Sequence, residues 1–154
     1  MNAPATPIRL LLVEDQQLVR EGLKGLLQLC PDIELIGEAE DGVQALERIQ
    51  ADIPDVVLSD MRMPRLDGIG LIRALAARQL PVPVLLLTTF DDREAGDEAA
   101  RAGAKGFVLK AISVETLAEA IREVAAGGTA LRPGLTERAT RPGATERAFE
   151  GLPD

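Results

Sequence analysis

The chain of 154 residues contains no histidine, no tryptophan and no tyrosine, and only one cysteine, Cys30. The lack of histidine excludes metal sites and general bases that depend on imidazole. A single cysteine excludes an internal disulfide bond and agrees with a reducing compartment. Because three Phe are the only aromatic residues, we expect an aliphatic core and no surface on which nucleic-acid bases stack.

Long apolar runs are missing as well. No run approaches the roughly 18 residues of a membrane span, and residues 1–7 lack the basic and apolar regions of a signal peptide. We therefore expect a short N-terminal tail over residues 1–7, no membrane partner and a cytoplasmic protein. The formal charge of −8 also makes the chain a poor match for the phosphate backbone of DNA.

Five apolar runs alternate with helical patterns along most of the chain. The runs are Ile8–Val13, Ile33–Gly37, Asp55–Ser59, Val82–Thr88 and Gly106–Leu109. Such alternation predicts βαβ units and a parallel sheet with helices on both faces. Five strands in some 120 residues favour an α/β, flavodoxin-like (βα)5 doubly wound fold with strand order 2-1-3-4-5.

The C-terminal part of the chain has a different composition. Residues 129–154 contain three Gly, three Pro and balanced charges, which is typical of a linker or tail. We therefore expect one domain over residues 8–128. Within it, Asp41 and Ser113 are suited to cap helices, whereas Gly96 weakens the helix expected between residues 92 and 101.

Acidic residues follow the two central strands of the predicted sheet. Glu14 and Asp15 come directly after the first strand, and Asp60 ends the third. In this topology ligands bind beyond the carboxyl ends of the strands at the switch in strand order, so the three carboxylates should converge. A hard cation such as Mg²⁺ would relieve their repulsion. The structural alternative is that Asp15 only caps a helix and Asp60 only shapes a turn.

Two further polar residues end the neighbouring strands. Thr88 ends the fourth strand and Lys110 follows the fifth. Lys110 lies two strands from Asp60, roughly 10 Å by strand spacing, a gap that a Lys side chain can largely cross. An ammonium group and a hydroxyl beside a carboxylate–metal pair are suited to binding a phosphoryl group. As an alternative, a lone Lys at a strand end is solvated and Thr is a common strand residue.

Four segments of the chain resemble the receiver domains of bacterial response regulators. They fall in order at the ends of strands one, three, four and five: Leu11–Asp15, Val57–Gly68, Leu87–Phe90 and Gly103–Lys110. The resemblance implies a signalling switch of a two-component system that accepts a phosphoryl group from a sensor histidine kinase. It implies Mg²⁺ as cofactor, with Mn²⁺ as the alternative ion, and only self-catalysed phosphorylation and dephosphorylation rather than enzymatic turnover.

The same resemblance assigns roles to single residues. Asp60 resembles the phosphoacceptor, and Asp15 resembles the direct Mg²⁺ ligand. Glu14 resembles the second acid, which usually acts through water, and the backbone carbonyl of Arg62 would be a third protein ligand. Lys110 resembles the phosphate-binding lysine, and Thr88 with Phe107 resembles the switch pair. Pro64, Asp67 and Gly68 resemble the residues that shape the loop after the phosphoacceptor.

Two shorter segments, Leu18–Leu23 and Ala125–Gly128, resemble the NarL/FixJ (LuxR-like) branch. In that branch a helix-turn-helix domain follows the linker, so the resemblance implies transcriptional output and DNA contact only through an effector domain absent from this chain. A stand-alone receiver acting through protein contacts is the alternative, and dimerisation on phosphorylation stays open. A receiver that signals without phosphorylation fits less well with the complete acid–Thr–Lys set. A metal-dependent phosphohydrolase would need a second acid two residues after its nucleophile, and position 62 is Arg.

Overall fold

The computed structural model describes residues 6–89, 95–110 and 112–130. Strands and helices alternate along this part of the chain, as the sequence predicts. The strands are β1 (Ile8–Val13), β2 (Ile33–Ala39), β3 (Val56–Asp60), β4 (Val84–Thr88) and β5 (Gly106–Leu109). The helices are α1 (Gln17–Leu27), α2 (Gly42–Ala51), α3 (Gly68–Ala77), α4 (Ala95–Ala102) and α5 (Val114–Ala125).

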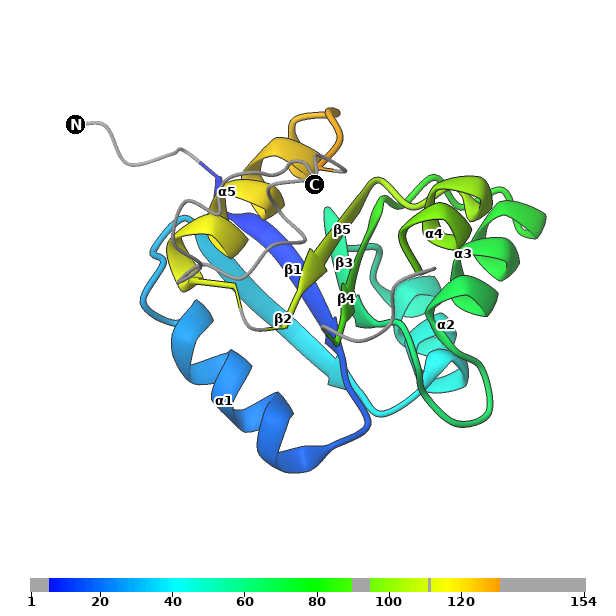
Figure 1. The fold of residues 1–154 in the computed structure, drawn as a ribbon, viewed down its shortest axis with the longest axis horizontal. Coiled ribbons are helices and arrows are strands. Elements are labelled where there is room, and N and C mark those ends of the chain that lie inside the picture. Colours follow the sequence, from blue (N-terminus) through cyan, green and yellow to red (C-terminus); the bar gives the residue numbers. More distant parts are fainter. Residues whose placement is uncertain (1–5, 90–94, 111, 131–154) are drawn as a thin grey trace, which may run out of the picture.

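The five strands form one parallel sheet in the order β2-β1-β3-β4-β5 (Figure 1). The flavodoxin-like fold predicted from the sequence is therefore confirmed. β1 lies between β2 and β3, so the strand order switches direction at β1 and β3. A crevice at the carboxyl ends of these two strands is where this topology places ligands.

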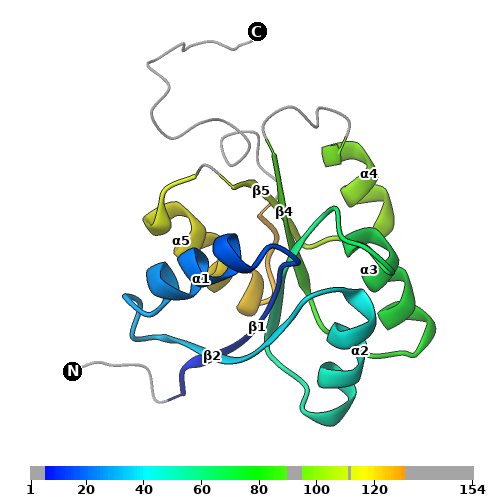
Figure 2. The same cartoon turned by 90° about the horizontal axis from the view of Figure 1, so that it is seen from below.

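Helices cover both faces of the sheet. α1 and α5 lie on one face and α2, α3 and α4 on the other (Figure 2). Successive strand residues point to opposite faces, so Leu10 and Leu12 pack beneath α1 and α5 whereas Leu11 and Val13 pack beneath α2 and α3. Because helices cover both faces of the sheet, every residue of the central strands β3 and β4 is buried. This is also why these strands consist mostly of apolar residues.

Side-chain caps begin three of the helices, and two of them, Asp41 and Ser113, are the caps expected from the sequence. Asp41 accepts a hydrogen bond from the N–H of Gln44, and Asp67 accepts one from the N–H of Gly70. Ser113 caps α5 through the N–H of Thr116. Each cap satisfies a backbone donor that has no partner within its helix.

Several element boundaries differ from the prediction by one or two residues: β2 ends at Ala39 rather than Gly37, and β3 is shifted by one residue to Val56–Asp60. β4 begins at Val84 rather than Val82, because Pro83 has no N–H to donate to a neighbouring strand. The expected fourth helix lies partly outside the described residues, and its described part, α4, runs from Ala95 to Ala102. No helix in the described ranges has both the length and the apolar character needed to cross a membrane.

An ion pair joins α5 to the loop before β2. Arg122 donates two hydrogen bonds to Asp32, at 2.6 and 3.0 Å, and they lower the pKa of the Asp32 carboxyl. A folded-state pKa below the unfolded one stabilises the fold above the ordinary Asp pKa of about 3.9, and this stabilisation is lost as the pH falls through the folded value.

We therefore expect Arg122→Gln to lower the free energy of unfolding by about 0.5–1 kcal/mol at neutral pH, since the pair is partly exposed. The difference from the unsubstituted chain should shrink as the pH falls below the ordinary Asp pKa of about 3.9 and through the lower folded pKa of Asp32. Urea unfolding at several pH values measures it, with Arg73→Gln on the exposed face of α3 as control. A difference that does not shrink as the pH is lowered below about 3.9 would contradict the ionic origin of the effect.

Candidate functional site

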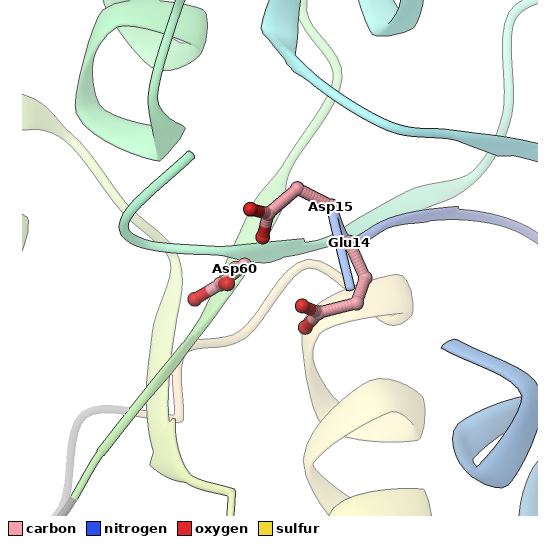
Figure 3. A group of neighbouring side chains, drawn as sticks. All are labelled: Glu14, Asp15 and Asp60. Carbon is pink, nitrogen blue, oxygen red and sulfur yellow. The ribbon is translucent and has the colours of Figure 1, made fainter. Parts of the chain in front are cut away.

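Three carboxylates meet at the switch in strand order. Glu14 and Asp15 follow β1, and Asp60 is the last residue of β3, the strand beside β1. One carboxylate oxygen of each residue lies within 4.8 Å of the others. Figure 3 shows the three side chains gathered at the strand ends. The convergence expected from topology is therefore present in the structure.

Asp15 does not cap the first helix. The residue before α1 is Gln16, and no side-chain cap is formed there. The N–H of Gln16 instead donates to Oε2 of Glu14, at 3.2 Å. The structural alternative for Asp15 is thus wrong, and its carboxylate is left for the cluster.

Glu14 is fully buried although it carries an ionisable group. Burial, and next the negative charge of Asp60, raise the pKa of the Glu14 carboxyl. The backbone of Glu14 is held by two contacts: its N–H donates to the carbonyl of Ala39, and its own carbonyl accepts from Arg20 Nη1 at 2.6 Å. The buried carboxylate is therefore fixed in place beside Asp60.

Lys110 reaches the cluster across β4. Its Nζ lies 3.1 Å from Oδ2 of Asp60 and 3.2 Å from Oε1 of Glu14. Burial of the ammonium lowers the pKa of Lys110, but the charges of Asp60 and Glu14 outweigh it and raise that pKa overall. The sequence predicts the contact with Asp60, whereas the ion pair with Glu14 was missed.

The cluster has the donor set of a hard-cation site. The contact between Lys110 and Oε1 of Glu14 is an ion pair without hydrogen-bond geometry, so this buried oxygen has no hydrogen-bond partner. One ammonium also cannot neutralise three carboxylates. A divalent cation with oxygen ligands would supply both the missing charge and the missing partner, so the residues present fit Mg²⁺.

The two residues of the expected switch pair lie on β4 and β5. Thr88 is buried at the carboxyl end of β4, one residue beyond Leu87, which pairs with Asp60. The ring of Phe107 is also buried and packs against Gly96 of α4, where an added Cβ would come within 3.3 Å of Cε2. Gly96, which the sequence suggests as a weak point of the helix, therefore leaves room for this ring.

The loop between β3 and α3 carries the residues that follow Asp60. The N–H of Arg62 lies 3.4 Å from Oδ1 of Asp60, and its side chain is 3.7 Å from Glu98 of α4. Gly68 is needed at the end of this loop because an added Cβ would lie 2.7 Å from the carbonyl oxygen of Asp60 and 2.7 Å from Leu86. The prediction of Gly68 as a loop-shaping residue thus has a steric basis.

A clamp that the sequence did not reveal holds the same loop against α2. Arg65 adopts a left-handed backbone conformation, with φ of 69°, and its Nε and Nη2 each lie 2.8 Å from Oδ2 of Asp41. The N–H of Gly42 also donates to the carbonyl of Leu66. Positive φ is unusual for a residue with a long side chain, so the residue type at position 65 gave no signal for it.

Comparison with known proteins agrees with the fold and identifies the family. Residues 10–122 match the family model described as "Response regulator receiver domain". The transcriptional regulatory protein DegU of Brevibacillus brevis is 36% identical over 129 residues, which are 84% of this chain and 55% of DegU. LnrK of Bacillus subtilis is 37% identical over 145 residues, which are 94% of this chain and 66% of LnrK. The chain thus spans between about half and two thirds of the length of these relatives.

Solved structures give the same result. The signal receiver domain of NarL from Mycobacterium tuberculosis matches with a TM-score of 0.75 and 37% identity, covering 79% of this chain and 98% of that domain. A LuxR-family two-component response regulator from Aurantimonas matches with a TM-score of 0.78 and 28% identity, covering 87% of this chain and 96% of that regulator's chain. These matches confirm the resemblance suggested by the sequence motifs. The chain belongs to the response regulator receiver domain family, and its relatives are NarL-, DegU- and LuxR-type regulators of two-component systems.

Proposed function

We propose that this receiver is a phosphorylation switch in which Asp60 accepts a phosphoryl group from a sensor histidine kinase. The observation that carries the proposal is the position of Asp60, whose carboxylate is buried between two further acids and Lys110. In the transfer, a carboxylate oxygen of Asp60 forms a bond to phosphorus while the bond from phosphorus to the imidazole nitrogen of the donor breaks. The imidazole leaves with the electron pair.

We assign the metal to the acidic cluster. Asp15 and Asp60 would bind Mg²⁺ directly, Glu14 would act through water, and the carbonyl of Arg62 would be a third protein ligand; Mn²⁺ is the alternative ion. The cation would neutralise charge on the phosphoryl oxygens. Support for this assignment comes from the three converging carboxylates and from the orphaned oxygen of Glu14.

The remaining residues act on the phosphoryl group and on the signal. Lys110, already 3.1 Å from Asp60, would bind a phosphoryl oxygen, and the hydroxyl of Thr88 would donate to another. Movement of Thr88 toward the phosphoryl group leaves space into which Phe107 can turn, and α4 packs on Phe107. A change at Asp60 could thereby reach the surface of α4.

Transcriptional control is the output that the relatives favour. The regulators DegU and LnrK are longer than this chain, and we propose that DNA contact takes place through an effector domain outside it. The receiver itself would be a regulatory domain rather than an enzyme. A phosphorylation-dependent homodimer, a domain boundary at residue 128 and a cytoplasmic location stay predictions.

Acetyl phosphate with Mg²⁺ tests the assignment of Asp60. We expect intact-mass spectrometry to show one added phosphoryl group on the full chain and none on Asp60→Asn. Asp52→Asn, which removes an exposed charge on the α2–β3 loop, should be modified like the unsubstituted chain. Equal modification of Asp60→Asn, or steady release of phosphate from added phosphate esters, would overturn the proposal.

A further inference from the structure

The loop between β3 and α3 is held at its base and at its tip. At the base, the N–H of Gly68 donates to the carbonyl of Met61 at 3.1 Å. At the tip, the loop contacts the start of α2. Arg62 lies between these two fixed points, and its N–H is 3.4 Å from Oδ1 of Asp60. The contacts at the tip therefore act on the segment that joins Asp60 to α3.

One buried carboxylate holds the tip. Asp41 is only 6% exposed. Its Oδ1 accepts from the N–H of Gln44 and so caps α2, whereas its Oδ2 lies 2.8 Å from both Nε and Nη2 of Arg65. Burial raises the pKa of the Asp41 carboxyl, but the hydrogen bonds from Gln44 and Arg65 outweigh burial and lower that pKa overall. A charged carboxylate thus binds the helix and the loop at the same time.

The residue after Arg65 fits closely against two glycines. The N–H of Gly42 belongs to the first turn of α2, where backbone donors have no partner within the helix, and it donates to the carbonyl of Leu66 at 2.8 Å. An added Cβ at Gly42 would overlap Leu66, and one at Gly70 would lie 2.6 Å from Cδ1 of Leu66. The tip of the loop is therefore seated against α2 by backbone as well as by side-chain contacts.

The backbone of Arg65 is strained. Its φ of 69° is unfavourable for a residue with a Cβ, whereas glycine adopts it freely. Such strain persists only where the surroundings impose it, and it is frequent at ligand sites. Among the described residues one other non-glycine residue has a positive φ: Gln79, with φ of 56°, which is exposed and follows the far end of α3.

We propose that Arg65 is a positioning residue whose ion pair with Asp41 fixes the loop so that the carbonyl of Arg62 can bind Mg²⁺. The inference rests on the proposed function, which assigns this carbonyl to the metal. Residues that orient metal ligands change the affinity for the metal by about 10–100-fold when they are substituted. Because Arg65 acts through the backbone of the loop, we expect an effect at the lower end, about tenfold.

The charge of Arg65 by itself predicts the opposite result. Arg65→Gly removes a cation from the loop beside the acidic cluster, so a purely electrostatic effect would tighten the binding of Mg²⁺. Loss of the positioning contact should weaken it. Glycine also adopts the φ of this position without strain, so the backbone gives no reason for the variant to unfold. The direction of the change in affinity therefore separates positioning from charge.

Titration of the full chain with Mg²⁺ alone, followed by the amide resonance of Met61, measures this affinity. We expect the Kd of Arg65→Gly to be about tenfold higher than that of the unsubstituted chain. Gln79→Gly relieves the same kind of strain at the far end of α3 and should leave the Kd unchanged. Asp41→Asn keeps a good helix cap, so the double variant Asp41→Asn with Arg65→Gly removes the ion pair without changing the net charge. It should also bind Mg²⁺ about tenfold more weakly.

Amide hydrogen exchange without metal gives an independent readout of the loop. The N–H of Gly42 donates to the carbonyl of Leu66, so its exchange should become faster by about tenfold or more in Arg65→Gly. The amide of Leu58, in the central strand β3, should keep its protection and so report that the variant is folded. Unchanged exchange of Gly42 would show that Arg65 does not hold the tip, and it would overturn the inference.

The outcome of the titration separates this inference from the proposed function. If Arg65→Gly binds Mg²⁺ as tightly as the unsubstituted chain, or more tightly, the positioning role is wrong and the proposed function stands. If the unsubstituted chain itself shows no shift of the Met61 resonance with Mg²⁺, the metal assignment of the proposed function fails and the positioning role fails with it.

Discussion

Gly68→Ala should lower the free energy of unfolding by about 2–3 kcal/mol, because the added methyl group has no space. Its Cβ would lie 2.7 Å from the carbonyl oxygen of Asp60 and 3.2 Å from the Cα of Met61, both backbone atoms. The backbone of Gly68 does not have a positive φ, so the cost is steric. Relief of the clash would displace the end of β3, and phosphorylation of Asp60 should fall as well.

Gly25→Ala is the matched control. Gly25 lies in α1, where an added Cβ would meet nothing within 4 Å, so alanine should stabilise the helix by about 0.5–1 kcal/mol. Urea unfolding of both variants measures the contrast. If Gly68→Ala were as stable as Gly25→Ala, the tight contact between α3 and the end of β3 would be wrong.

Lys110→Met should destabilise the domain by about 2–3 kcal/mol when divalent cations are chelated. Removal of one partner from a buried ion pair leaves the other charge uncompensated, at a cost of about 3–5 kcal/mol in fully buried cases. The Lys110 side chain is 23% exposed, which reduces the expected cost. Glu14 and Asp60 would then face each other without the ammonium that now lies between them.

Addition of Mg²⁺ should recover much of this loss, since an ion that binds only the folded state stabilises it. Lys105→Met is the control, because Lys105 is exposed at the start of β5 and its change should stay within about 0.5 kcal/mol. Urea unfolding of the unsubstituted chain and of both variants, each with EDTA and with Mg²⁺, gives the six values needed. Equal stability of the two variants in EDTA would show that Lys110 is not the counterion of the cluster.

The sequence was sufficient for the features that depend on topology. The order of the strands follows from the alternation of apolar runs and helices, and it brings Glu14, Asp15 and Asp60 to one edge regardless of side-chain detail. The reach of Lys110 to Asp60 could be predicted for the same reason, since strand spacing and the length of a Lys side chain are fixed quantities.

The features that depend on side-chain direction were not predictable. The pairing of Glu14 with Lys110 requires the carboxylate to turn into the core rather than toward solvent. Gly96 was interpreted only as a residue that weakens its helix, because its contact with the Phe107 ring depends on how α4 packs against β5. The left-handed Arg65 has its ion-pair partner, Asp41, 24 residues earlier in the chain.

The aliphatic core has a practical consequence for spectroscopy. Phe107 is the only aromatic side chain among the described residues, and the chain has no Trp or Tyr. The protein is therefore nearly silent in near-ultraviolet absorbance and fluorescence. A tryptophan introduced at one chosen position would report on its own surroundings without background, and ring resonances of Phe107 could be assigned with little overlap. Because aromatic residues are scarce, the surroundings of Phe107, the side chain proposed to move, can be followed by NMR or by the fluorescence of an introduced tryptophan.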